Sequence, residues 1–229
     1  EVDVEKTDGI IAVGRFLSAE LEKMKQLGIQ VLFVDSNPDP HEFNSIQPNL
    51  QMMVETAIEY FVQAGYQKIG FIGGRSWDST EGRHVLRDTR TRCFESRARE
   101  LGLFNQNYVF IGDNFSVDSG YQVGREIVGK IRDDLPQGFL VASDPLAVGV
   151  LQAFNENKLT VPEDVSMISI NDIDIAKYVS PPLTTFRIDT EELGKVAIET
   201  LRNLIVSPKK FRRMILLDAD LVFRKSFVI

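Results

Sequence analysis

The chain has 229 residues, of which 43% are hydrophobic and 26% are charged, and its formal net charge at pH 7 is -7. This composition is typical of a globular protein with one large or two modest domains, and it excludes a disordered chain. The negative charge argues against nucleic-acid binding by these residues themselves, because phosphate neutralisation needs clustered Lys and Arg. The single Cys93 excludes an internal disulfide and any metal site built from several cysteines.

Membrane and secretory signals are missing from the sequence pattern. No apolar run reaches membrane-spanning length, and residues 1–8 lack the positive and apolar segments of a signal peptide. A lone cysteine also suits a reducing compartment. We therefore expect a cytoplasmic protein without a membrane partner, and we interpret the short basic stretch at 209–213 as a solvated turn.

Apolar strand-like runs alternate with amphipathic helical segments. The first part of the chain is predicted to contain strands at 9–13, 31–34 and 68–72 and helices at 18–27 and 50–64. Ser18 is predicted to cap the first of these helices, and Gly28 and Gly65 to end the two helices. A loop is predicted from residue 73 to about residue 88.

The second part continues the same alternation. It is predicted to contain strands at 108–111, 139–142 and 165–170 and helices at 89–101, 118–133, 146–157 and 190–206. Residues 180–185 predict a proline-fixed start of a further strand, and the runs 215–217 and 221–223 predict a hairpin around Asp218 and Asp220. Alternation of this regularity predicts an α/β fold with a mainly parallel sheet and helices on both faces.

Polar residues stand at the carboxyl ends of several predicted strands, which is the edge where open α/β sheets bind ligands. In chain order they are Asp35, then Ser143 and Asp144, then Asn171 and Asp172. A buried carboxylate there can accept two vicinal sugar hydroxyls without a counter-charge from the ligand. For Asp144 and Asp172 the alternative is that each caps the following helical turn.

The sequence lacks the motifs of an enzyme. His41 and His84 lie in predicted loops, and neither belongs to a helix-spaced metal pair or stands beside a nucleophile motif. There is no phosphate-binding G-x-x-x-x-G-K-[ST] and no G-x-G-x-x-G after a strand. We therefore expect no catalysis, no cofactor and no metal site.

A series of segments in matching order resembles the effector-binding core of the LacI/GalR family of bacterial transcriptional repressors. These segments are DGII at 8–11, VLFVD at 31–35, AGYQKIGFIGG at 64–74, SGY at 119–121, SD at 143–144, VPEDV at 161–165, PLTT at 182–185 and FRKS at 223–226. Each is weak alone, but the ordered series covers nearly the whole chain. The resemblance implies the two-lobed fold of the sugar-binding periplasmic proteins (type I).

The resemblance also implies a domain organisation. Residues 1–47 and 188–216 would form an N-terminal lobe, and residues 48–187 and 217–229 a C-terminal lobe, with the ligand in the cleft between them. Family members begin with a DNA-binding headpiece and the first strands of the core. The chain opens before what resembles the third strand, so we expect the headpiece to be absent and the N-terminal lobe to be incomplete.

Six residues are candidates for the ligand site: Asp35, Arg90, Phe115, Ser143, Asn171 and Asp172. Arg90 matches the family arginine that contacts effector, and Phe115 stands where sugar-binding members often place an aromatic ring against a pyranose. The alternative for Phe115 is simple core packing. Asn171 departs from the usual family Asp, which leaves hydroxyl recognition intact but changes its geometry.

The function implied by the resemblance is a sugar-responsive repressor that binds operator DNA through the headpiece. The segment 43–46 and Asn171 resemble the galactose-operon branch of Gram-positive repressors, which makes galactose or a galactoside the first candidate effector. A homodimer would form through the helix from Leu146 and the segment 174–179. The alternative is a stand-alone solute-binding protein of a transport system, which would have the same cleft.

Overall fold

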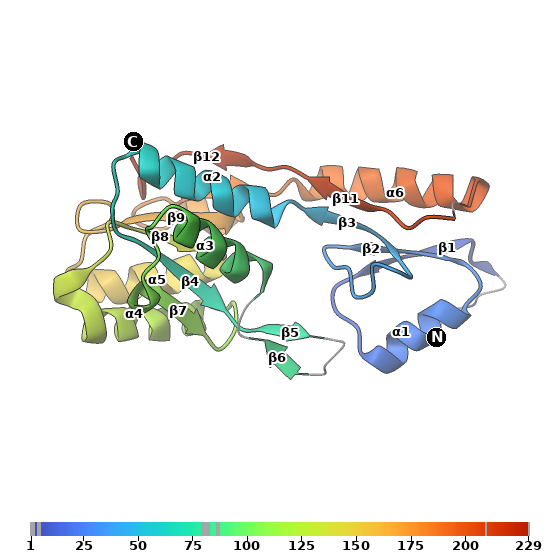
Figure 1. The fold of residues 1–229 in the computed structure, drawn as a ribbon, viewed down its shortest axis with the longest axis horizontal. Coiled ribbons are helices and arrows are strands. Elements are labelled where there is room, and N and C mark those ends of the chain that lie inside the picture. The colour runs from blue at the N-terminus through green and yellow to red at the C-terminus, as the bar shows by residue number, and fades with distance from the viewer. Residues whose placement is uncertain (1–2, 4–5, 79–82, 86–87, 209, 229) are drawn as a thin grey trace. The chain divides into compact units, whose positions relative to one another are not determined.

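The computed structural model describes residues 3, 6–78, 83–85, 88–208 and 210–228 (Figure 1). The chain divides into two compact units. The first contains residues 1–49, 77–84 and 189–218, and the second contains residues 50–76, 85–188 and 219–229. The lobes expected from the sequence have boundaries one or two residues earlier and include residues 77–84 in the C-terminal lobe.

The first unit is a parallel sheet with the strand order β1-β2-β3-β11. Its elements are β1 (Gly9–Val13), α1 (Ser18–Gln26), β2 (Gln30–Val34), β3 (Asn44–Pro48), α6 (Thr190–Val206) and β11 (Met214–Leu217). Phe33 of β2 is fully buried, and the ring centroids of Phe16 and Phe43 lie 5.6 and 4.8 Å from its own. Helix α6 packs against β1, β2 and β3. It buries one stripe, formed by Leu193, Ala197, Leu201 and Leu204.

The second unit is a larger sheet with the strand order β12-β10-β9-β8-β4-β7. Its strands are β4 (Ile69–Gly74), β7 (Val109–Gly112), β8 (Gly138–Val141), β9 (Ser166–Asn171), β10 (Thr184–Arg187) and β12 (Asp220–Val222). All neighbouring strands pair in parallel except β12, which runs antiparallel to β10 at the edge. The carboxyl ends of five strands therefore share one edge of the sheet.

Four helices cover this sheet on its two faces. They are α2 (Leu50–Gln63), α3 (Thr89–Glu100), α4 (Val117–Ile131) and α5 (Asp144–Glu156). Helices α2 and α3 pack together, as do α4 and α5, and Figure 1 shows the two pairs on opposite sides of the strands. The chain passes from β4 to the edge strand β7 through α3. It then returns to the other side of β4, reaching β8 through α4 and β9 through α5. Right-handed crossovers in opposite directions place helices on opposite faces. This arrangement confirms the predicted α/β fold class.

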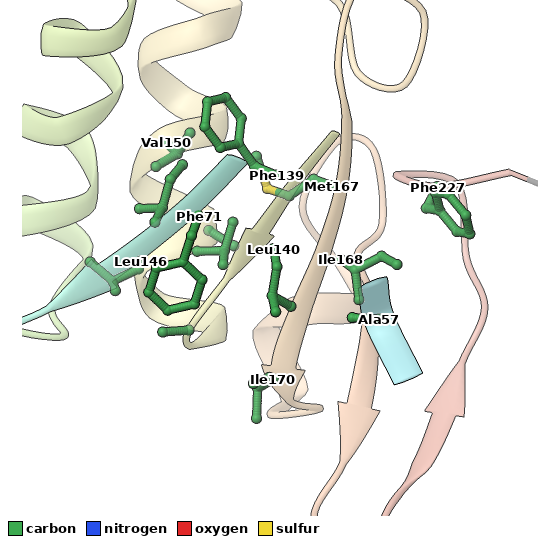
Figure 2. Packing of buried hydrophobic residues seen from close by; sticks show 14 of the residues in the cluster. Ala57, Phe71, Phe139, Leu140, Leu146, Val150, Met167, Ile168, Ile170 and Phe227 are labelled. Atoms are coloured by element: carbon green, nitrogen blue, oxygen red, sulfur yellow. The ribbon is translucent and has the colours of Figure 1, made fainter. Parts of the chain in front are cut away.

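Side chains alternate between the two faces of the central strands. Phe139 pairs with Met167 in the register of β8 and β9, and Leu140 pairs with Ile168, so each pair points to its own face. Figure 2 shows Phe139 on the side of α5 and Ile168 beside Ala57 of α2. All five of these side chains are completely buried. The sheet is thus buried on both faces, which explains its continuous apolar runs.

Helices α4 and α5 cross at a distance that only glycine permits. A Cβ added to Gly120 would lie 2.1 Å from the carbonyl oxygen of Leu146, and one added to Gly149 would lie 2.0 Å from that of Val117. Both neighbours are backbone atoms, which cannot move aside as a flexible side chain can. The close crossing positions the start of α5, which carries the residues at the carboxyl end of β8.

The structure corrects several local predictions. Ser18 is the first residue of α1 and not its cap; the cap position is held by Leu17, whose backbone N–H donates to the carboxylate of Glu20 at 2.7 Å. The predicted loop at 73–88 contains two short paired strands, β5 (Ser76–Asp78) and β6 (Arg83–Val85). Strand β3 was not predicted, because it carries Asn44, Ser45, Gln47 and Pro48 and lacks an apolar pattern.

The predicted hairpin near the end of the chain is wrong. Strand β11 pairs in parallel with β3 in the first unit, whereas β12 pairs antiparallel with β10 in the second. The two strands are consecutive in the sequence but belong to different sheets. Two short apolar runs around a polar turn fit both arrangements, and only the distant partners decide between them.

Candidate functional site

The carboxyl edge of the sheet in the second unit gathers five of the six predicted site residues. Asn171 ends β9 and Asp172 follows it, Ser143 follows β8, and Phe115 follows β7. Arg90 lies in the first turn of α3. Parallel strands expose unpaired backbone groups and side chains at this edge, which is where open α/β sheets bind ligands.

Arg90 is held by contacts on three sides. Its Nε donates to Oδ2 of Asp88 at 2.9 Å, its second terminal nitrogen also donates to that oxygen, and its first donates to the carbonyl oxygen of Ala142 at 2.7 Å. The guanidinium carbon lies 4.4 Å from the ring centroid of Phe115. Because Ala142 directly precedes Ser143, these contacts fix Arg90 beside the end of β8.

Phe115 contacts Arg90 through one face of its ring. The ring also lies close to Gly74, where an added Cβ would come within 3.2 Å of its Cδ2 atom. Phe115 is partly buried against the core of the second unit. The structure therefore places the ring under the guanidinium, so that one of its faces supports Arg90 and is covered by it.

Ser143 has a buried hydroxyl without a partner among the described residues. The residue is 5% exposed, and its Oγ atom makes no hydrogen bond to any described residue. It occupies the N-cap position of α5, but its side chain does not cap the helix. A buried hydroxyl normally has a partner, so this atom is a candidate contact for a bound ligand.

Asp172 forms ion pairs with two arginines, Arg187 at the end of β10 and Arg224 just after β12. Its Oδ2 accepts from Nε of Arg187 at 2.8 Å, and its Oδ1 accepts from a terminal nitrogen of Arg224 at 2.5 Å. The side chain of Asp172 is 2% exposed. Burial opposes its ionisation, but hydrogen bonds and charges of both arginines outweigh burial and hold the pKa of Asp172 below its ordinary value. The carboxylate is therefore charged and occupied by protein partners, and it does not cap a helical turn.

Asp144 is also occupied by protein donors. Its carboxylate is completely buried and accepts from Oγ of Ser169 at 2.5 Å, from Oγ1 of Thr185 at 2.7 Å and from the backbone N–H of Ile173 at 2.8 Å. Burial raises the pKa of Asp144 despite these bonds, and the nearby charge of Asp172 acts in the same direction. The residue ties α5 to β9 and β10, a structural role that differs from both the ligand contact and the capping that the sequence left open.

Asp35 belongs to the first unit. It follows β2, is exposed, and donates its backbone N–H to the carbonyl oxygen of Ile46 at 2.9 Å. The next two residues carry buried polar atoms, Oγ of Ser36 and Oδ1 of Asn37, that have no hydrogen-bond partner among the described residues. The carboxyl end of β2 therefore offers unsatisfied polar groups that sequence reasoning did not single out.

Backbone strain is concentrated at the predicted site residues. Among the described non-glycine residues, positive φ angles occur at Asp35 (61°), Asn171 (122°), Asp172 (53°) and Lys158 (59°). Lys158 lies in the turn after α5, where a left-handed residue commonly ends a helix. The other three lie at strand ends, and such conformations persist where the surrounding structure over-determines them, as at ligand sites.

Three residues of the site were missed at the sequence level. Asp88 orients Arg90, and Arg187 and Arg224 pair with Asp172. Asp88 could have been found from its position two residues before Arg90, at the predicted start of the helix, where an Asp can cap the helix and reach the arginine. The two arginines are remote in sequence from Asp172, so only the strand order brings them together.

The described part of the chain contains no group of three or more His, Cys, Asp or Glu side chains that could hold a metal ion. None of the described helices has the length and apolar character needed to cross a bilayer.

Comparison with known proteins agrees with this fold. Residues 58–227 match the family described as periplasmic binding protein-like domain. Solved structures with the same fold include a transcriptional regulator CelR–cellobiose complex, with a TM-score of 0.81 at 21% identity over 97% of this chain and 67% of that one. Another is a LacI family transcriptional regulator from Enterococcus faecium with bound ribose, with a TM-score of 0.77 at 23% identity over 97% of this chain and 80% of that one.

Curated relatives are more similar in sequence. The HTH-type transcriptional regulator GanR of Bacillus subtilis (strain 168) is 39% identical over 97% of this chain and 67% of its own length. LacR of Lactobacillus helveticus is 41% identical over 96% of this chain and 65% of its own length. GalR of Lacticaseibacillus casei is 36% identical over 97% of this chain and 66% of its own length. The chain belongs to the LacI/GalR family of transcriptional regulators and spans about two thirds of the length of these relatives.

Proposed function

We propose that this chain is the effector-binding and dimerisation part of a cytoplasmic, sugar-responsive transcriptional repressor. The names of the relatives GanR, LacR and GalR support a regulator rather than a transport protein or an enzyme. Neighbouring structures with bound ribose and cellobiose support a sugar as effector. We propose galactose or a galactoside as that sugar.

The observation that carries the proposal is the set of polar groups at the carboxyl edge of the sheet in the second unit. Arg90 is fixed by Asp88 and Ala142, yet the bonds among described residues use only three of its five N–H groups. The unpartnered hydroxyl of Ser143 follows directly after Ala142. Donors of this kind, with Asn171, suit a hydroxyl-rich ligand. We also propose Asp35 as a ligand-binding residue.

The mechanism we propose is a shift between two conformations of the regulator. Effector binds one conformation more tightly and therefore increases its population. In the full-length protein this would change the affinity of a DNA-binding headpiece for its operator. The coupling must be reciprocal, so operator DNA must also change the affinity for sugar.

Sugar binding can be tested by calorimetry with galactose and lactose. Replacement of Arg90 or Ser143 by Ala is expected to weaken binding, by about tenfold for Arg90, because a buried polar partner loses its hydrogen bonds. Arg99→Ala is the matched control. Like Arg90, Arg99 pairs with a carboxylate and lies over an aromatic ring. Its terminal nitrogen is 3.5 Å from the Glu95 carboxylate, and its guanidinium carbon is 3.9 Å from the ring centroid of Phe104. It lies near the other end of α3, away from the candidate site. Equal losses in the Arg90 and Arg99 variants would count against the proposed site.

Coupling to DNA is tested on the full-length protein. Sugar affinity is measured with and without operator DNA, and a difference is expected in the direction set by the sign of regulation. Identical affinities in the two conditions would exclude the proposed coupling.

The proposed homodimer surface includes α5 and residues 174–179. Two apolar side chains of this segment are exposed, Tyr178 at 80% and Ile175 at 43%. Exposed apolar side chains that cluster in this way are typical of an interface. Tyr178→Asp is expected to shift the protein toward monomer in sedimentation velocity. Tyr108→Phe, which removes one hydrogen bond to Asp134 outside this surface, should leave the mass unchanged.

A further inference from the structure

The arginines at the carboxyl edge of the second unit are compensated by carboxylates. Arg90 pairs with Asp88, and Asp172 pairs with both Arg187 and Arg224. Asp144 adds a further carboxylate close to Asp172. The edge is therefore rich in hydrogen-bond donors but close to neutral in charge.

Asp88 is the residue that neutralises the arginine of the candidate site. The side chains of Asp88 and Arg90 are 12% and 13% exposed, so water screens this pair weakly. One oxygen of Asp88 accepts from Arg90, and the other accepts from the backbone N–H of Thr91 at 3.1 Å, which caps α3. The carboxylate thus has two separable roles, a helix cap and a counter-charge.

Charge compensation has a direct effect on which ligands can be bound. A buried phosphate is costly unless a cation is available to pair with it, because the anion loses its hydration. An arginine whose charge is already matched offers N–H donors for hydroxyl and ring oxygens, but little net attraction for an anion. A sugar that carries a phosphate group would add an unpaired charge to this edge.

We infer that Asp88 is a specificity-determining residue that orients Arg90 for a neutral sugar and excludes the phosphorylated form of that sugar. This inference rests on the proposed function, and it names the ligand class more narrowly. It predicts that the protein binds galactose at least about tenfold more tightly than galactose 1-phosphate or galactose 6-phosphate. The phosphate group would lose its hydration on binding, and only a charge-assisted bond to an unpaired cation could offset that loss.

The test replaces Asp88 while the helix cap is retained. Ser and Asn are both strong N-cap residues, so Asp88→Ser and Asp88→Asn remove the counter-charge without removing the cap. Calorimetry on the full chain measures the affinities for galactose and for both phosphates. The ratio of these affinities is the readout, because a purely structural defect would weaken all three ligands together.

The expected result is a fall of about tenfold in the preference for galactose over at least one of the two phosphates, in both variants. Asp164→Asn is the control: it removes the same charge from the turn before β9, where Asp164 accepts from the backbone N–H of Thr160 at 2.7 Å. That variant should keep the wild-type ratio.

The outcomes separate the inference from the function on which it rests. If galactose binds and either phosphate binds equally well to the wild-type protein, the charge argument is wrong while the proposed function stands. If the ratio is unchanged in both Asp88 variants, Asp88 does not determine specificity. If the wild-type protein binds none of the three compounds, the proposed galactose response fails, and the inference fails with it.

Discussion

The carboxylate of Asp144 joins three segments of the second unit, and its conversion to an amide tests this role. In Asp144→Asn the amide oxygen can replace Oδ1, which accepts from Ser169 and Thr185. The amide NH2 then faces the backbone N–H of Ile173, which donates to Oδ2 in the wild-type protein at 2.8 Å. One buried N–H loses its acceptor, and a second donor is buried without one.

The magnitude follows from these two groups. Each buried unsatisfied donor costs about 1–3 kcal/mol. Part of this cost is offset because the neutral amide is less costly to bury than the charged carboxylate. We expect a net loss of about 3 kcal/mol in the free energy of unfolding. For a chain of this size that loss lowers the midpoint of thermal unfolding by roughly 6–12 °C.

Circular dichroism during heating and during urea titration measures this loss. Asp144→Ala, which leaves all three donors without an acceptor, should be at least as destabilising. The exposed Asp164→Asn variant serves as the control and should unfold near the wild-type midpoint. A wild-type midpoint for Asp144→Asn would refute the assignment of Asp144 as a structural acceptor.

The remaining predictions concern packing, pH and the aromatic support of Arg90. Gly149→Ala should destabilise by about 1–3 kcal/mol or more, because its Cβ would meet backbone atoms of α4, whereas Gly129→Ala, with nothing within 4 Å, should be neutral or stabilising in urea unfolding. Because the pKa of Asp172 lies below its ordinary value of 3.8, its stabilising contribution is complete above that pH and is lost as the pH falls further; Asp172→Asn should flatten this acid limb of the stability curve. Phe115→Leu should weaken galactose binding with little loss of stability, and a large drop in the unfolding midpoint would instead identify Phe115 as core.

The fold could be predicted from sequence where local patterns determine it. The apolar run before Asn171 predicted a buried strand with a polar tip, and β9 has that form. Strand β3 was missed because its mostly buried polar residues lie between two partner strands, β2 and β11, and β11 is distant in the sequence. The same limitation explains the false hairpin, since parallel partners cannot be read from a short apolar run.

The sequence predicted where the candidate site residues lie, but not which protein groups they bind. Strand ends and the resemblance located Arg90, Ser143 and Asn171 at one edge of a sheet. They did not reveal that Asp172 is already paired with two arginines, because one of these ends β10 and the other follows β12. Polar residues at a strand tip look alike in sequence whether their hydrogen bonds are satisfied within the protein or left open.

The short connection between β11 and β12 constrains how this chain can change in length. Strand β11 ends at Leu217 and β12 begins at Asp220, so only two residues join strands that belong to different sheets. A deletion here would have to be absorbed by sliding one strand along its neighbour, and a shift of one position turns inward-facing side chains outward. Natural variants should therefore tolerate gains and losses of residues elsewhere on the surface far better than at residues 218–219.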